Sequence, residues 1–176
     1  MTAQELRPDS FIDIKCCNAA KHIRELIGDL PPTKSDYDVY SLELYSDLYS
    51  FLEYDVLCGK YLDQEIIYCR VALPHIDKFW DRHIFLNFTL GDGVHFFGDL
   101  ENPEEIEISH GTFFVVDPMI KHWLYPLELR TVPCDEGKPR MFVALSWAIN
   151  KNNQDDVYRI VESFCKFDKT IGESNA

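Results

Sequence analysis

From residue 61 to residue 150 the sequence is a series of short apolar runs separated by turn residues, with no helical pattern between them. The runs are rich in β-branched and aromatic residues. "HIFLNFTL" stops at "GDG", and "GTFFVVD" stops at Pro118. Seven or eight strands in direct succession exclude a doubly wound α/β sheet, because parallel strands need a crossover helix between them. The pattern therefore predicts an antiparallel barrel or jelly roll.

Helical patterns flank this β-rich region. In "DIKCCNAAKHIRELIGDL", which starts at Asp13, apolar residues recur at helical spacing, and Gly28 is a natural helix end. Residues 31–38 read as a loop. Residues 40–57 favour a second helix, although the early part of this segment also alternates as a strand does.

The C-terminal segment carries Val157, Ile160, Val161 and Phe164 on one helical stripe, and the tail from residue 168 is expected to fray. We therefore expect one domain over residues 1–176. It comprises mostly helical support over 1–60, a jelly-roll core over 61–150 and a C-terminal helix over 154–167. The fold class is mainly β, braced by N-terminal helices and a C-terminal helix.

Charge and composition bound the classes of function. The formal net charge is −13, which disfavours nucleic acid as a partner, because Lys and Arg provide affinity for phosphate backbones. No apolar run approaches the length of a membrane span and the N-terminus is polar, so we expect a soluble cytoplasmic protein. The six cysteines are irregularly spaced without C-x-x-C, which favours reduced thiols over a structural zinc site. P-loop, G-x-S-x-G and H-E-x-x-H motifs are absent from the sequence.

The motif H-x-D occurs at the start of the β-rich region. His75 and Asp77 lie two residues apart in "VALPHIDKFW", just before "HIFLNFTL". In extended backbone the side chains of residues i and i+2 point to the same face, so this imidazole and carboxylate would project together. One nitrogen and one carboxylate oxygen form part of a metal site. The triplet alone is weak evidence, because it also arises by chance.

His122 is the best candidate for a third ligand. It follows a strand that ends at an Asp-Pro turn, and in a jelly roll its separation from Asp77 can bring it back beside the first strand pair. Two His and one carboxylate that leave one side of the ion open are the facial triad of non-haem Fe(II) oxygenases. The order of features strengthens the hypothesis: H-x-D, a Gly-led strand ending in Asp-Pro, a His after the Pro, and Arg140 opening the last strand.

Arg140 precedes the final apolar run in "KPRMFVALSW". A planar guanidinium grips a carboxylate with two hydrogen bonds, which suits a small dicarboxylate cosubstrate. If a strand starts at Arg140, then Phe142, Ala144 and Ser146 share its face.

These pieces resemble the Fe(II)/2-oxoglutarate-dependent oxygenase superfamily, whose core is a double-stranded β-helix of the cupin type. Within that superfamily, the quoted segments are similar to those of the aspartyl/asparaginyl β-hydroxylases and related bacterial proline hydroxylases. The resemblance covers residues 66–150, over "PHID", "RHIFLNFTL", "HGTFFVVDPMIKHWLYP" and "PRMFVALSWAI". It does not extend to the first 60 residues.

The resemblance implies that His75, Asp77 and His122 bind Fe(II), and that Arg140 binds the distal carboxylate of 2-oxoglutarate. The link from His122 to Arg140 is longer than is usual in the family, which makes Arg130 a rival for that role. The implied reaction uses O2 and hydroxylates a C–H of an amino acid, or of a peptide or protein side chain, giving succinate and CO2. Further candidates for the pocket are Trp80, Arg82, His83, Asn87, Trp123 and Ser146.

Two other functions stay open. A metal-binding cupin enzyme without 2-oxoglutarate would use more histidines, and His95 or His110 could then be ligands. A non-catalytic β-barrel could instead serve as a binding or sensor module. Metal analysis together with 2-oxoglutarate turnover would separate the three.

Overall fold

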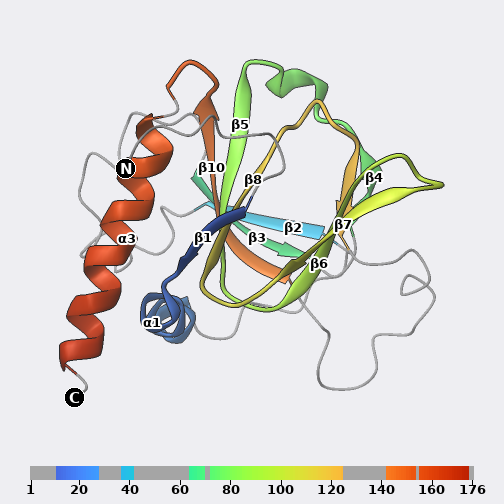
Figure 1. Cartoon of the computed structure of the whole chain (residues 1–176). Coiled ribbons are helices and arrows are strands. Elements are labelled where there is room, and N and C mark those ends of the chain that lie inside the picture. The colour runs from blue at the N-terminus through green and yellow to red at the C-terminus, as the bar shows by residue number, and fades with distance from the viewer. Residues whose placement is uncertain are drawn as a thin grey trace, which may run out of the picture.

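The computed structural model describes residues 11–27, 37–41, 64–69, 72–124, 142–153 and 155–174, which form two antiparallel sheets and two helices (Figure 1). The larger sheet has the strand order β1-β8-β5-β10-β3-β2 and the smaller sheet the order β4-β9-β6-β7. Every described strand pair is antiparallel. This arrangement is a jelly roll with flanking helices, so the predicted fold class is confirmed.

The strands of the larger sheet are β1 (Phe11–Lys15), β2 (Tyr37–Ser41), β3 (Gln64–Cys69), β5 (His83–Thr89), β8 (Thr112–Val116) and β10 (Phe142–Asn150). Those of the smaller sheet are β4 (Ala72–His75), β6 (Gly93–Gly98), β7 (Pro103–Ile108) and β9 (His122–Leu124). The helices are α1 (Cys17–Ile27), α3 (Asp155–Ser174) and a short 3-10 turn η3 (Lys78–Trp80).

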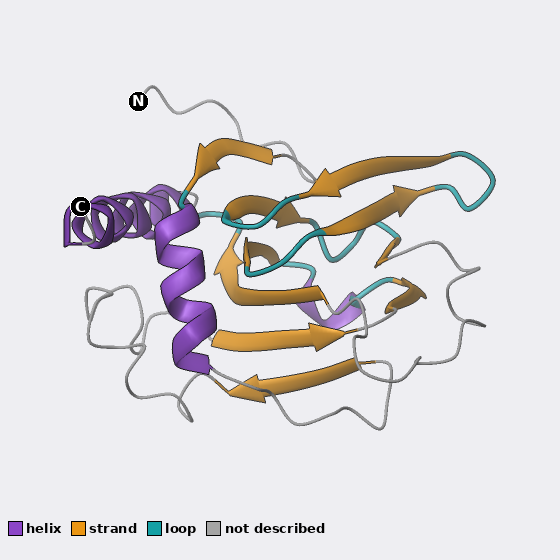
Figure 2. Cartoon of the chain, turned by 90° about the horizontal axis from the view of Figure 1, so that it is seen from below, coloured by secondary structure: helices purple, strands orange, loops and turns teal. Residues whose placement is uncertain are grey.

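Both α-helices lie on the same side of the strands (Figure 2). Alternation along the larger sheet separates its two faces. In β5, Ile84, Leu86 and Phe88 pack with the helices, whereas Phe85 packs with residues of the smaller sheet. In β10, Leu145 and Trp147 face the helices, and Ala144 faces the smaller sheet. On the larger sheet, the face toward the space between the sheets therefore carries the set that includes Phe85 and Ala144.

The N-terminal region contains more β-structure than predicted. Residues 11–15 form strand β1 along the edge of β8. The sequence pattern had placed residues 13–15 at the start of a helix and residues 11 and 12 before it. Ile12 and Ile14 pack against the helix-side core, and the Cys16 amide donates to the Gly111 carbonyl (2.8 Å) where the helix begins. Pairing with an open sheet edge outweighs the local helical pattern here.

Residues 37–41 were also assigned incorrectly, to a loop and to the start of a helix, and they form strand β2 on the edge of β3. The alternation in this stretch was the stronger signal. The rest of the predicted helix over 40–57 lies outside the described residues.

The C-terminal helix is longer than predicted, because it continues from residue 167 to Ser174. The tail does not fray within this range, since Asp168 contacts the first turn of α1. Its carboxylate accepts hydrogen bonds from the Ala19 amide (2.8 Å) and the Asn18 side chain (3.4 Å). An acidic group on α3 thus caps α1, and the contact favours helix on both sides. None of the helices in the described part of the chain has the length and apolar character needed to cross a membrane.

Candidate metal centre

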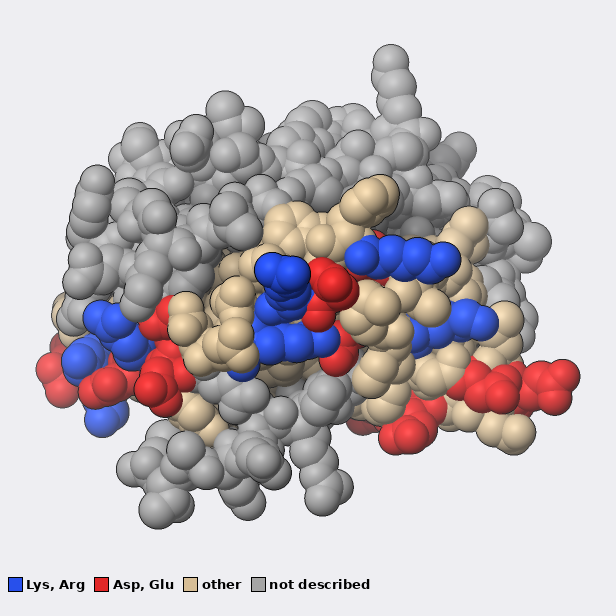
Figure 3. All heavy atoms as spheres, turned by 90° about the horizontal axis from the view of Figure 1, so that it is seen from above, with Lys and Arg blue, Asp and Glu red and all other residues tan. Residues whose placement is uncertain are grey.

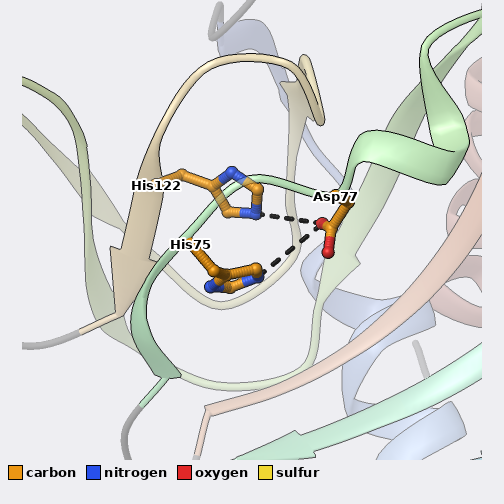
Figure 4. A group of neighbouring side chains, drawn as sticks. All are labelled: His75, Asp77 and His122. Atoms are coloured by element: carbon orange, nitrogen blue, oxygen red, sulfur yellow. Dashed lines mark ion pairs between the residues drawn. The ribbon is translucent and has the colours of Figure 1, made fainter.

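His75 and His122 are brought together by the pairing of β4 with β9, in which they are directly opposite each other. Their ring centroids are 4.4 Å apart. Asp77 follows β4 and turns back toward both rings (Figure 4). One of its carboxylate oxygens, Oδ2, lies 3.4 Å from Nε2 of His122 and 3.6 Å from Nε2 of His75. The structure therefore gathers the three ligands predicted from sequence.

The backbone orients both imidazoles. Nδ1 of His122 bonds the carbonyl of Ile120 (2.8 Å), and Nδ1 of His75 bonds the carbonyl of Leu73. A carbonyl only accepts, so each Nδ1 carries the proton. In the neutral ring Nε2 then carries a lone pair. Each Nε2 points at a carboxylate oxygen, which also has only lone pairs, so in this tautomer all three groups could donate electron pairs to a cation.

The Asp117-Pro118 turn holds the backbone of Asp77, and so its carboxylate, in place. The Asp77 amide donates to the carbonyl of Pro118 (2.8 Å). Within the turn, the carbonyl of Asp117 accepts from the Ile120 amide (3.0 Å), and its carboxylate accepts from the Met119 amide (2.9 Å). Lys151, just beyond β10, pairs with the same carboxylate at 3.1 Å. Asp117 and Pro118 thus support the candidate ligands but are not themselves among them.

The charge state of Asp77 suits a ligand. Burial raises the pKa of this carboxyl, but the neighbouring imidazoles of His122 and His75 lower it further, so the net pKa is below the usual value. The group is ionised at neutral pH.

The three residues fit a first-row divalent ion. Their ligand atoms all lie within 4.8 Å of one another. Two imidazole nitrogens and one carboxylate oxygen are a common donor set for iron. His122 is buried, with 9% of its side chain exposed, whereas Asp77 and His75 are 32% and 41% exposed. One side of the centre is consequently open, as a site that takes up further ligands requires.

His95 lies beside this group. It is buried in β6, and its ring stacks on that of His122 at a centroid distance of 5.8 Å. Neither of its nitrogens has a hydrogen-bond partner among the residues that the structure describes. Burial, together with the charges of His122 and His75, lowers its pKa to about 3, so the ring is neutral. It is not among the grouped ligand atoms of the described residues.

His110, the other alternative ligand, lies elsewhere. Its amide donates to Asp92 (2.8 Å), and its carbonyl lies 3.8 Å from the thiol of Cys17, at the start of α1.

The candidate pocket residues fall on different faces. Trp80 lies edge-on to His83 (5.3 Å between centroids) and to Phe85 (5.7 Å), near the centre. Asn87 and Ser146 are paired across β5 and β10, and both are buried on the face between the sheets. Arg82 is exposed at the end of the η3 segment.

Trp123 does not line the interior beside the ligands. It alternates with His122 and Leu124 along β9, and Leu124 faces the inter-sheet core. Trp123 instead stacks on Phe96 (5.7 Å, 9°) on the opposite face of the smaller sheet. Its place next to His122 in sequence is therefore misleading, because adjacent residues of a strand point to opposite sides. Arg140 and Arg130 lie outside the described residues.

The sequence did not reveal Lys151 as part of the support for this site. Its pairing with Asp117 joins residues 34 apart, and no local pattern indicates it. The hydrogen bonds from Nδ1 of His75 and His122 to backbone carbonyls could not be read from the sequence, because they depend on the backbone geometry at residues 73 and 120.

Comparison with known proteins gives structural likeness alone. Neither a protein-family model nor a curated protein matches the sequence. Among solved structures, the chain is similar to a 2OG-Fe(II) oxygenase family protein from Burkholderia pseudomallei, with a TM-score of 0.49 and 13% identity over 76% of this chain and 78% of that one.

It is also similar to vicilin from hazelnut (Corylus avellana), with a TM-score of 0.38 and 10% identity over 73% of this chain. An oxalate decarboxylase from Bacillus subtilis gives a TM-score of 0.41 and 8% identity over 72% of this chain. The chain spans 33% of the vicilin and 29% of the decarboxylase. At 8 to 13% identity these likenesses concern the fold alone.

The sheet order and the flanking helices make the chain a jelly roll with a candidate centre of two histidines and one aspartate.

Proposed function

We propose that the chain is an Fe(II)- and 2-oxoglutarate-dependent dioxygenase that hydroxylates a C–H of an amino acid, or of a peptide or protein side chain. The observation that carries the proposal is the convergence of two histidine Nε2 atoms on one Asp77 oxygen, with one side open. The overall reaction converts R–H, 2-oxoglutarate and O2 into R–OH, succinate and CO2. Bound Fe(II) would supply the redox chemistry of that conversion.

The residues of the chain provide binding and orientation. His75, Asp77 and His122 would hold the ion. The backbone carbonyls of Leu73 and Ile120 keep both Nε2 atoms free for it. The Trp80 amide donates to the Asp77 carbonyl (2.9 Å) and the Trp80 ring contacts Phe85, and apolar groups beside the centre would limit access of water.

The test of the metal centre is calorimetric titration with Mn(II), which stands in for Fe(II) without oxidation. His122→Ala should lose most of the affinity, because two remaining ligands hold an open site poorly. His110→Ala is the matched control and should bind as the parent does. Unchanged Mn(II) binding by His122→Ala would refute the three-residue centre.

Arg140 is the proposed anchor of the distal 2-oxoglutarate carboxylate. Losing a buried, bidentate, charge-assisted pair costs about 2–4 kcal/mol, or roughly 30- to 1000-fold in cosubstrate affinity. Arg140→Ala should raise the 2-oxoglutarate requirement by that factor and keep Mn(II) binding. Succinate release, followed by NMR for this variant and for Arg130→Ala, is the measurement. If only Arg130→Ala fails, the anchor is Arg130.

One observation favours the alternative of a cupin enzyme without 2-oxoglutarate. The unpartnered His95 beside His122 would suit a centre that uses more imidazoles. Two results together would support this alternative. The metal-loaded parent protein would form no succinate from 2-oxoglutarate, and the His95→Ala variant would bind Mn(II) more weakly than the parent.

A further inference from the structure

Two segments border the candidate metal centre: residues 76–82 after β4, which are mostly exposed, and residues 118–121 before β9, of which only Met119 is exposed. The hydrogen bond from the Asp77 amide to the Pro118 carbonyl fastens them to each other. Each segment exposes large apolar side chains: Ile76 is 37% exposed, Phe79 98% and Met119 42%. Exposed apolar groups that gather at one place mark a contact surface, whereas isolated ones carry no such meaning.

The same two segments carry three cations, Lys78, Arg82 and Lys121. Among the described residues, none of the three takes part in an ion pair. The acidic residues of the two segments are Asp77, which belongs to the candidate centre, and Asp81. We call these three cations and the three apolar residues the rim, which consists of Ile76, Lys78, Phe79, Arg82, Met119 and Lys121.

The positive charge of the rim runs against the charge of the chain, which has 17 Lys and Arg but 30 Asp and Glu. Viewed from the side where η3 lies, Lys and Arg side chains lie over the middle of the face with acidic side chains among them, and further acidic side chains lie at its left and right edges (Figure 3). The nearby β6–β7 hairpin is acidic, with Glu104, Glu105 and Glu107 exposed. A cationic area of this kind on an acidic protein attracts anions and guides them to one place.

We propose that the rim binds an acidic peptide or unstructured protein segment that also carries apolar residues, and presents one of its side chains to the metal centre. This inference rests on the proposed function, because it names the class of its substrate. A free amino acid bound at the ion would be too small to cover both segments and would leave Phe79 in water. An extended segment can reach both, with the aromatic side chain as an anchor and the cations guiding its approach.

The experiment measures fluorescence anisotropy of a labelled 12-residue peptide with four Glu and two Leu, added to the Mn(II)-loaded full chain. The rim variant is Lys78→Glu/Arg82→Glu/Lys121→Glu. The matched control is Lys15→Glu/Lys166→Glu/Lys169→Glu, which makes the same charge change at exposed positions away from the rim. We expect the rim variant to weaken binding at least about 10-fold and the control less than about 2-fold, because only nearby charges escape screening by salt.

Two further measurements examine the apolar part. Phe79→Ser should weaken binding about 5- to 10-fold, as expected for an aromatic anchor. Replacing both Leu of the peptide by Ser should weaken it by a similar factor, and replacing its Glu by Lys should abolish it.

Equal affinity in the rim variant and the matched control overturns the inference. So does binding to phosphatidylserine vesicles without binding to the peptide, which would make the rim a membrane contact. Succinate release without peptide, measured on the same proteins, separates this failure from that of the proposed function. Peptide binding without succinate refutes the dioxygenase but keeps the docking surface; succinate without peptide binding refutes the docking surface alone.

Discussion

His95 places two nitrogens in the interior of the protein that find no hydrogen-bond partner in the described part of the chain. The ring is 3% exposed and is flanked by Phe114 (5.4 Å between centroids), Phe97 (6.3 Å) and His122. A buried polar group without a partner costs about 1–3 kcal/mol. The residue therefore opposes folding of the metal-free protein.

Replacing this ring with an apolar one of similar shape should relieve the cost. We expect His95→Phe to raise the free energy of unfolding of the metal-free protein at pH 8 by about 1 kcal/mol, measured by urea denaturation. The gain should grow as the pH falls. The folded-state pKa of about 3 lies below the usual value of 6.5, so the unfolded chain binds the extra proton between these values.

The parent should accordingly lose stability from His95 by up to about 1.4 kcal/mol for each pH unit below 6.5, and the variant should not. His22→Phe, at a half-buried ring on α1, is the control for a general effect of removing a histidine. A His95→Phe variant that is less stable than the parent at both pH values would show that the nitrogens have partners in solution.

At the scale of elements, the turn over residues 117–120 positions the candidate centre. It supplies the carbonyl that holds His122, the carbonyl that fixes the Asp77 backbone, and a carboxylate that ties the turn to Lys151 after β10. A short turn between two strands thus sets the relative positions of two ligands from different segments.

Asp117→Ala should therefore weaken Mn(II) binding about 10-fold, although all three candidate ligands are kept. Removing groups that orient metal ligands typically has an effect of this size. The physical reason is that the Met119 amide and Lys151 lose their common acceptor. Titration calorimetry measures the effect. Glu162→Ala, which breaks an exposed pair with Lys166 on α3, should leave affinity unchanged. Equal affinity of both variants with the parent would contradict the role of the turn.

At the scale of the whole molecule, Phe164 joins the helices to the larger sheet. It is fully buried on α3, and its ring contacts Phe88 (4.4 Å), Phe113 (5.4 Å) and Trp147 (5.7 Å). This aromatic cluster lies on the helix-covered face of the larger sheet, whereas the candidate centre is built on β4 and β9 of the smaller sheet. The packing that stabilises the fold is thus separate from the candidate centre.

Phe164→Ala should cost about 3–5 kcal/mol of unfolding free energy, because it leaves a cavity among large rings. Mn(II) affinity of the folded protein should stay the same. Urea denaturation and calorimetry are the two measurements, and Phe79→Ala, at a 98% exposed ring, is the control for stability. A loss of Mn(II) affinity that accompanies the loss of stability would show that this packing and the candidate centre are coupled.

Local patterns in the sequence were enough to predict the class of fold. Runs such as "HIFLNFTL" and "GTFFVVD" became β5 and β8 because β-branched and aromatic residues bounded by turn residues are a signal that acts over a few neighbours. The three residues of the candidate centre could also be proposed from sequence, since H-x-D places two side chains on one face. A His after an Asp-Pro turn completes the set.

Only the tertiary structure decided which segments fill the sheet edges and which side each residue faces. Residues 11–15 became a strand because β8 offered an unpaired edge, and α3 extends past residue 167 because Asp168 meets the start of α1. Trp123 points away from its neighbour His122, and Lys151 reaches Asp117, through strand register and packing. Such contacts join residues far apart in the chain, so their energies leave no local pattern. The identity of the ligand atoms is a property of the sequence, but their convergence is a property of the fold.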